Sequence, residues 1–167
     1  MTDDPVSALG ANRRTDRASR FIRATPKRVY QALTDPGQFA HWIAPEGARA
    51  TIDRFEPEPD GALQITLTFD PRSGSAKTTA NTDVVKGRFL TLDRGRCVKQ
   101  AFEFESTDPA FAGTMTMTWR LALALGGTTV EVTAEDVPPG ISAADHHAGM
   151  ASSLANLAAL FEQDDAA

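Results

Sequence analysis

Residues 115–123 read MTMTWRLAL, and this alternation of apolar and polar side chains decides the fold class. A period of two predicts a β-strand with one buried face and one wet face. Residues 63–69 repeat the pattern, and residues 98–104 and 129–134 follow it less regularly. Between Ala48 and Asp136 we expect an antiparallel meander of six or seven strands. Turn signals separate its runs: Pro59-Asp60-Gly61, Ser73-Gly74-Ser75, Lys86-Gly87-Arg88 and Gly126-Gly127.

Two short helices and one long helix are expected around this sheet. After a first strand at residues 17–24, Thr25-Pro26 and Asp35-Pro36 each pair a capping side chain with a proline that is tolerated at the first helical position. The second short helix is expected to end near Trp42. A long helix then begins at Ser142 and runs to about Glu162. Its apolar stripe consists of Met150, Leu154, Leu157 and Phe161.

The expected fold class is α+β, with a curved antiparallel sheet wrapped around the long C-terminal helix. A length of 167 residues fits one domain. We predict a flexible N-terminal arm over residues 1–16, a single domain over residues 17–163 and a tail over residues 164–167. Hydrophobic residues make up 41% of the chain and charged residues 23%, which argues against global disorder.

Composition also limits the cellular setting. The apolar runs are far shorter than the roughly 20 residues that a membrane span needs. Cys97 is the only cysteine, so an internal disulfide framework is excluded. No charged and then apolar leader opens the sequence, and a cytoplasmic protein is the expectation.

Charge is distributed unevenly along the chain. The net charge of −5 has the wrong sign for a dedicated nucleic-acid binder. Residues 121–167 hold seven acids and no Lys or Arg, yet residues 146–161 of the long helix carry no Asp, Glu, Lys or Arg. Small residues on its outer side predict a homodimer, unless alanine was selected for helix propensity alone. These residues are Ala148, Ala151, Ser152, Ala155, Ala158 and Ala159.

Several short motifs, taken in order, carry a family resemblance. They are RFIRATP at residues 20–26, VYQALTDP at 29–36, FAHWIAP at 39–45, TTVEVT at 128–133, and Gly149-Met150 followed by Leu154, Leu157 and Leu160. Residues 17–162 thereby resemble the SRPBCC superfamily of START-like and Bet v 1-like helix-grip proteins. Within it, the chain is most similar to the AHSA1 group of Hsp90 ATPase activators. Met150 stands where many relatives carry tryptophan.

The resemblance implies a cavity between the sheet and the long helix that holds an apolar small molecule. Trp42 and Trp119 are candidate walls of this cavity, because an indole offers a large apolar face and one hydrogen-bond donor. Flexible thioethers make a pocket adaptable. The remaining candidate lining residues are Met115, Met117, Met150 and Leu154. For each of these residues, ordinary core packing is the alternative interpretation.

Two adjacent histidines, His146 and His147, begin the long helix and are candidates for a hydrogen-bond partner or general base at the cavity mouth. Helical neighbours lie about 100° apart, so one metal ion is not expected to take both side chains. We therefore predict no metal site, and no cofactor is expected. The alternative is that both histidines are partly exposed near the helix start.

Other reactive groups have weaker patterns. Glu103 and Glu105 share one face of a strand, and we expect that face to be solvated because Phe102 and Phe104 occupy the other. The opposite register would turn both carboxylates into the cavity. Cys97 follows Arg94 and Arg96, but no pattern supplies a base for a catalytic thiol.

Three functions remain open. The leading hypothesis is binding of an apolar or amphipathic small molecule, similar to a lipid, a polyketide or an aromatic compound. The second is an enzyme of the polyketide cyclase/dehydratase type that uses a cavity histidine or carboxylate. The third is an interaction module resembling the Hsp90 activators. Hydrolase-elbow, P-loop and Rossmann motifs do not occur, so the corresponding enzyme classes are not supported.

Overall fold

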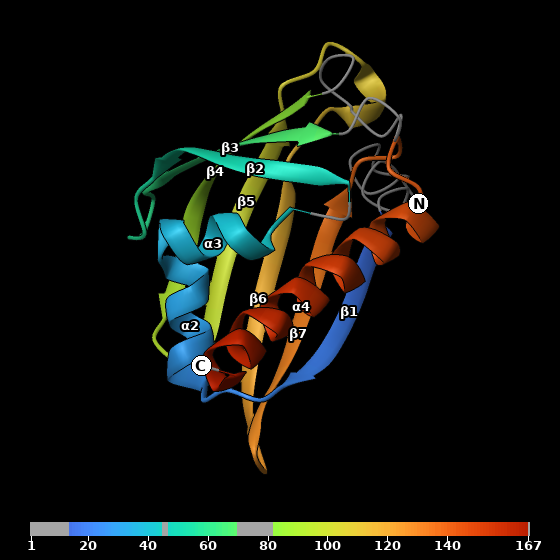
Figure 1. Cartoon of the computed structure of the whole chain (residues 1–167). Helices are drawn as coiled ribbons and strands as arrows, with labels where there is room; N and C mark the ends of the chain where they lie inside the picture. The colour runs from blue at the N-terminus through green and yellow to red at the C-terminus, as the bar shows by residue number, and fades with distance from the viewer. Residues whose placement is uncertain (1–13, 45–46, 70–81, 167) are drawn as a thin grey trace, which may run out of the picture.

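A curved antiparallel sheet of seven strands forms the body of the molecule, and its strand order is β1-β7-β6-β5-β4-β3-β2. The computed structural model describes residues 14–44, 47–69 and 82–166, with side chains described as far as Glu162. The long helix α4 lies across one face of the sheet, and α2 and α3 close one end of it (Figure 1). The elements are β1 (Arg14–Ile22), α2 (Pro26–Thr34), α3 (Pro36–Trp42), β2 (Ala48–Phe55), β3 (Ala62–Phe69), β4 (Thr82–Asp93), β5 (Cys97–Phe104), η1 (Pro109–Phe111), β6 (Met115–Ala124), β7 (Gly127–Val137) and α4 (Ala143–Ala166).

This arrangement confirms the predicted α+β helix-grip fold, including the two short helices after the first strand. The helix starts have the expected chemistry. Thr25 Oγ1 accepts a hydrogen bond from the Arg28 amide at 3.2 Å, and Asp35 Oδ1 accepts one from the Gly37 amide at 3.0 Å. Ser142 Oγ accepts from the amide of Asp145 at 3.1 Å, so each capping oxygen satisfies an amide that the helix itself leaves unpaired.

Local predictions differ from the structure in several places, and one of them is the end of α4, which continues to Ala166 through most of the predicted tail. β1 begins at Arg14, three residues before the predicted start at Arg17, because residues 14–16 pair with the end of β7. The predicted turn at Lys86-Gly87-Arg88 is wrong, since these residues lie inside β4. Gly87 is there because a Cβ would come within 2.3 Å of the carbonyl oxygen of Ala101 on β5. Residues 14–16 of the predicted N-terminal arm lie in β1. The rest of that arm, residues 1–13, and the turn predicted at residues 73–75 lie outside the described residues.

The hydrophobic core lies between the sheet and α4, on what we call the inner face of the sheet. Edge-to-face ring contacts link α3 to the sheet through Phe39, Trp42 and Trp119, with centroids 5.1 Å apart in both pairs. Phe55 and Phe89 extend this aromatic group toward β2 and β4. Edge-to-face ring contacts add a small stabilisation to that gained from burying the ring surfaces.

Helix α4 is held to the rest of the fold by apolar and polar contacts. Met150, Leu154, Leu157 and Phe161 are all buried, as the predicted stripe requires. Ser153 Oγ donates to the carbonyl of Ile43 at 2.9 Å, and Asn156 Nδ2 donates to that of Ala44 at 2.9 Å. These bonds satisfy backbone carbonyls that follow α3.

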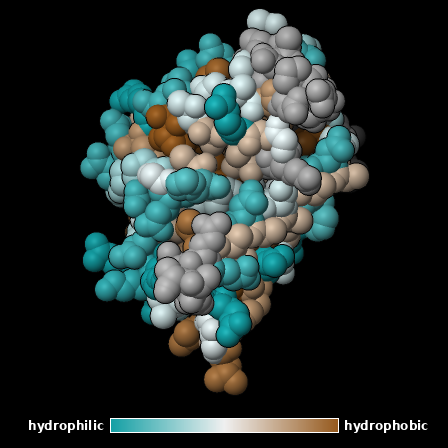
Figure 2. All heavy atoms as spheres, in the orientation of Figure 1, coloured by the Kyte–Doolittle hydropathy of each residue, from teal (hydrophilic) through white to brown (hydrophobic). Residues whose placement is uncertain are grey.

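Fewer of the small residues of α4 are exposed on its outer side than the sequence predicted. Figure 2 shows small apolar residues along this helix, but Ala158 is 6% exposed and belongs to the core. Ala158 is buried because it shares a helix face with Leu154 and Phe161. Ala148 and Ala151 are exposed. The homodimer remains a prediction, to be measured by light scattering.

Candidate functional site

The inner face of the sheet has two halves that differ in burial. One half, around Trp119, is well covered: Val98, Val130 and Val132, on the strands that flank it, are each 0% exposed. Other inward apolar side chains of the sheet pack against the core but stay partly exposed, among them Phe55, Leu92 and Phe104. Four of these partly exposed residues form what we call the open apolar face: Ala50, Ile52, Leu67 and Met117.

The open apolar face lies toward the N-terminal end of α4. Met117 on β6 is opposite Ala134 on β7, which in turn is opposite Asp16 on β1. Asp16 contacts His146 in the first turns of α4. Ala50 and Leu67 are cross-strand partners on β2 and β3, the strands that fold over toward α4 (Figure 1). The partly exposed apolar residues therefore lie on the inner side of the sheet, near the start of α4.

Trp119 lies two residues from Met117 on β6, Trp42 packs against it, and both indoles are almost completely buried. Trp42 Nε1 donates to the carbonyl of Ala32 at 2.8 Å. Trp119 Nε1 donates to Gln100 Oε1 at 3.0 Å. Each indole has only one donor, so neither has a hydrogen available for a ligand. Their contribution to a site would be an apolar wall.

The other predicted lining residues are brought to the same interior. Met115, Met150 and Leu154 are 4%, 4% and 1% exposed, respectively. Met117 differs from the other predicted lining residues of the sheet, because its side chain packs against the core but stays partly exposed. Thioether side chains change rotamer at low cost, so this wall is able to repack around a ligand.

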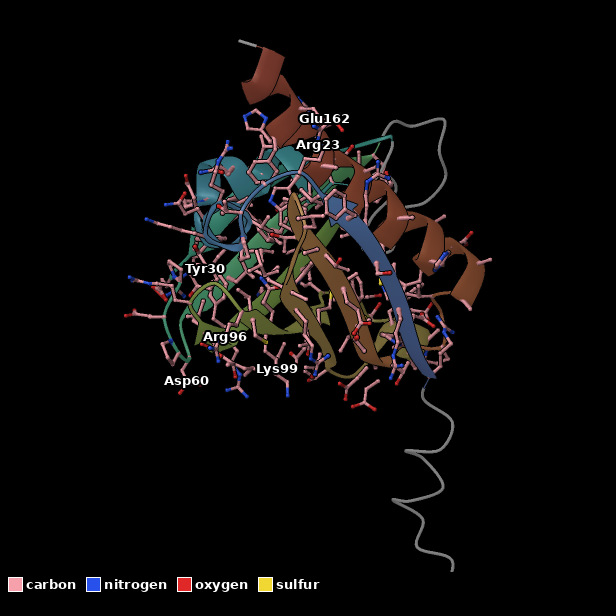
Figure 3. The ribbon with its side chains drawn as sticks, turned by 90° about the horizontal axis from the view of Figure 1, so that it is seen from below. Arg23, Tyr30, Asp60, Arg96, Lys99 and Glu162 are labelled. Carbon is pink, nitrogen blue, oxygen red and sulfur yellow. The ribbon has the colours of Figure 1, made fainter. Side chains whose placement is uncertain are left out.

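Gln100 is a candidate site residue that the sequence reasoning missed. It is 0% exposed and lies between Val98 and Phe102 in the inward phase of β5. Its neighbour Lys99 points away from α4 in the view from below (Figure 3). Gln100 Nε2 has no hydrogen-bond partner within the described part of the chain. The sequence signal that could have identified Gln100 is a polar residue among the apolar, inward positions of a strand. Asp83 on β4, which is also 0% exposed, has the same pattern.

His146 belongs to a polar network that joins α4 to β1. His146 Nδ1 lies 2.7 Å from Asp16 Oδ2, and the side chain of His146 is 13% exposed. A carboxylate only accepts hydrogen bonds, so Nδ1 is the ring nitrogen that carries a proton in this contact. Arg14 Nε donates to Asp16 Oδ1 at 2.8 Å, and Arg14 also donates to the Ile141 carbonyl.

His147 is arranged differently. Its side chain is exposed, and its Nδ1 lies 3.2 Å from the carbonyl oxygen of Arg17. The two histidines therefore contact different partners on β1. Among the described residues, no group of three or more His, Cys, Asp or Glu side chains is placed to hold a metal ion.

Asp16 gives a testable stability prediction. Burial alone would raise its pKa, but hydrogen bonds and charge from Arg14 and His146 outweigh burial and lower the pKa below the ordinary 3.8. A lowered pKa in the folded state stabilises the fold above the unfolded pKa, and this stabilisation is lost as the pH falls through the folded value. Asp16→Asn is expected to lower the free energy of unfolding at pH 7 by about 1–3 kcal/mol.

Urea denaturation at pH 7 and at pH 3 measures this effect. The difference between wild type and Asp16→Asn should shrink at the lower pH. Glu105→Gln is the control, because the Lys86–Glu105 pair is 3.4 Å apart on the surface and its loss should cost under about 1 kcal/mol. A difference for Asp16→Asn that is unchanged at pH 3 would contradict the assignment.

The three weaker candidates, Glu103, Glu105 and Cys97, lie on the outward side of β5 or just after it. Glu103 and Glu105 are exposed, which confirms the solvated register, and Glu103 Oε1 accepts from Thr114 Oγ1 at 2.8 Å. The half-buried Cys97 also lies in the outward phase of β5. Burial raises the pKa of the Cys97 thiol, although Arg120 and Lys99 lower it in part. A raised thiol pKa disfavours the nucleophilic thiolate.

Comparisons with known proteins agree with this geometry. The family model described as "Activator of Hsp90 ATPase homolog 1-like protein" matches residues 23–162. A crystal structure from Chromobacterium violaceum is 29% identical, with a TM-score of 0.77 and coverage of 87% of this chain and 95% of that one. A solution structure from Arthrobacter aurescens is 17% identical, with a TM-score of 0.76 and coverage of 96% and 90%, respectively. The latter shows the fold alone.

A structure from Rhodobacter sphaeroides, 19% identical, covers 89% of this chain and 92% of its own with a TM-score of 0.74. No curated protein matches the chain. Among the described helices, none combines the length and the apolar character required to cross a bilayer.

Proposed function

The chain belongs to the family of proteins similar to the activator of Hsp90 ATPase homolog 1, and from this premise we propose that it binds an apolar or amphipathic small molecule between the sheet and α4. The supporting observation is the open apolar face. A domain of this size buries inward apolar side chains where it can, as it does at Val98 and Val132. Partial exposure of inward side chains at Leu67 and Met117 is what a ligand-covered wall requires.

Burial of apolar surface supplies the driving force. Each Å² of apolar surface removed from water contributes about 25 cal/mol, so a ligand of modest size binds without ion pairs. The ligand would extend from the Trp42–Trp119 pair toward Ala50 and Leu67. A lipid-, polyketide- or aromatic-like molecule has the required apolar body.

The neutral fluorescent probe N-phenyl-1-naphthylamine tests this proposal. Placing a charge on the inner wall with Met117→Glu should weaken probe binding at least about tenfold, because the carboxylate would be desolvated beside the probe. Leu123→Glu is the matched control: Leu123 lies on the same strand but is 81% exposed at the β6–β7 hairpin, and probe affinity should not change.

Fluorescence titration of wild type and the two variants provides the affinities. Circular dichroism of Met117→Glu establishes that the variant is folded. Failure of wild type to bind the probe, or an equal loss in the two variants, would contradict the proposed location.

A second function, catalysis of the cyclase/dehydratase type, is favoured by one observation. The Asp16 carboxylate fixes the tautomer of His146 and leaves Nε2 able to accept a proton. A base of this kind removes a proton from the carbon next to a ketone carbonyl, the first step of an aldol cyclisation.

Hydrogen–deuterium exchange at the methyl group of 2-acetylnaphthalene, followed by proton NMR, measures that step. Wild type should accelerate exchange over His146→Gln, and His147→Gln should behave like wild type. Equal rates for wild type and His146→Gln would exclude His146 as the base.

A further inference from the structure

We propose that Gln100 is the hydrogen-bond donor that selects the ligand, and that the ligand is an apolar molecule carrying a neutral carbonyl oxygen. This inference rests on the proposed function and specifies its ligand. It is carried by the orientation of the Gln100 side chain, by its burial and by the residues around it.

Trp119 determines which end of the Gln100 amide is available. The indole Nε1–H only donates, and its partner 3.0 Å away is therefore the amide oxygen, Gln100 Oε1. The amide nitrogen, Nε2, is thereby fixed as the unpaired end. It is buried and has no partner among the residues that the structure describes. Because unpaired buried donors are uncommon, this group is poised to bind an acceptor from outside the protein.

The position of Gln100 relative to the open apolar face gives the amide access to a ligand. Gln100 is opposite Phe89 on β4 and opposite Met117 on β6. Phe89 is 0% exposed, whereas Met117, in the inward phase of β6, is partly exposed. Gln100 therefore lies between a fully buried core residue, Phe89, and a residue of the open apolar face, Met117. Movement of the flexible Met117 side chain is the step that would admit a ligand atom.

The surroundings select a neutral acceptor over an anion. Inward neighbours of Gln100 on β4, β5 and β6 are apolar or, like Trp119, have their donor in use. The charged group in its cross-strand row is the Asp16 carboxylate on β1, which is already paired with Arg14, so the row offers no free cation to an anionic ligand. A buried carboxylate without a cation is strongly disfavoured. A hydroxyl group would bring a donor that needs its own partner, whereas a ketone or ester carbonyl needs only the Nε2 donor.

A matched set of naphthalene probes separates these possibilities. The probes are 2-acetylnaphthalene with a carbonyl, 2-ethylnaphthalene without one, and 2-naphthoate with a negative charge. Wild type should bind 2-acetylnaphthalene about tenfold more tightly than 2-ethylnaphthalene, the ratio expected for one buried hydrogen bond. It should bind 2-naphthoate more weakly than 2-acetylnaphthalene.

Gln100→Met removes the donor and nearly preserves the side-chain shape, and it should abolish the preference for the carbonyl probe. Because this variant leaves the Trp119 N–H without Gln100 Oε1, the double variant Gln100→Met/Trp119→Phe serves as a second test with both partners apolar. In wild type, the side-chain ¹⁵N–¹H resonances of Gln100 should shift with 2-acetylnaphthalene and not with 2-ethylnaphthalene.

The outcomes distinguish the two proposals. Equal affinities for the acetyl and ethyl probes, or an unchanged preference in the folded variants, would overturn the role of Gln100 and leave the proposed binding function standing. No binding of either probe to wild type would contradict the binding function itself, and the role of Gln100 with it.

Discussion

Replacing Trp119 by alanine is expected to lower the free energy of unfolding by about 4 kcal/mol. The Trp119 ring packs edge-to-face on Trp42 with centroids 5.1 Å apart, and its Nε1 donates to Gln100. The substitution removes the apolar contacts, leaves a cavity at the centre of the fold and frees a second polar atom of Gln100. A loss of this size is a large share of the 5–15 kcal/mol that holds a typical domain together.

Urea denaturation monitored by circular dichroism measures this loss. Trp119→Phe is the control, because it keeps most of the ring packing and removes the N–H donor. Its cost should be clearly smaller than that of Trp119→Ala. A cost below about 1 kcal/mol for Trp119→Ala would show that the ring is not part of a close-packed core.

Replacing Leu157 by alanine is expected to cost about 3 kcal/mol. Leu157 is 0% exposed and lies on the buried stripe of α4, which is the helix that covers the core. Leucine and alanine have similar helix propensities, so the loss reports packing of α4 on the sheet rather than helix formation.

Ala151→Ser is the matched control for Leu157→Ala, since Ala151 is an exposed residue of the same helix. Its cost should stay within about 0.7 kcal/mol, the range of helix propensities for such residues. Thermal and urea denaturation of both variants give the comparison. Equal small effects would mean that α4 is not docked through Leu157.

Sequence periodicity predicted most of the fold because each strand buries one face. The alternation around Met117 and Trp119 leaves one register that buries the apolar residues, and a one-residue shift would expose all of them. Helix starts were equally readable, since Thr25-Pro26 and Asp35-Pro36 combine a capping side chain with a proline. These signals depend on neighbouring residues alone.

Predictions failed where distant residues decide the local structure. Residues 86–88 resemble a turn in sequence, but Gly87 lies inside a strand. A glycine is needed there because Ala101 and Phe102 of the neighbouring strand leave no room for a Cβ. The first strand gains three residues through pairing between Arg14 and Val137, which are far apart in the sequence. Neither contact has a local signature.

The candidate site was predicted in part. Periodicity placed Met117 and Trp119 on the inner face, but it could not show that Gln100 takes the hydrogen bond of Trp119. It also could not reveal the Asp16–His146 contact, because Asp16 lies 130 residues away from its partner. Partial exposure of an inward residue such as Met117 depends on how far the sheet curves. The interaction-module hypothesis rests on the family name alone.

Binding of an apolar molecule against the open apolar face is the central claim, and intermolecular NOEs test it most directly. Wild type with ¹³C-labelled methionine and leucine methyl groups is mixed with 2-acetylnaphthalene. We predict NOEs from the ring protons of the probe to the methyl groups of Met117 and Leu67. NOEs confined to Leu123 and Leu125, the exposed apolar residues of the β6–β7 hairpin (Figure 2), would show surface adsorption and contradict the claim.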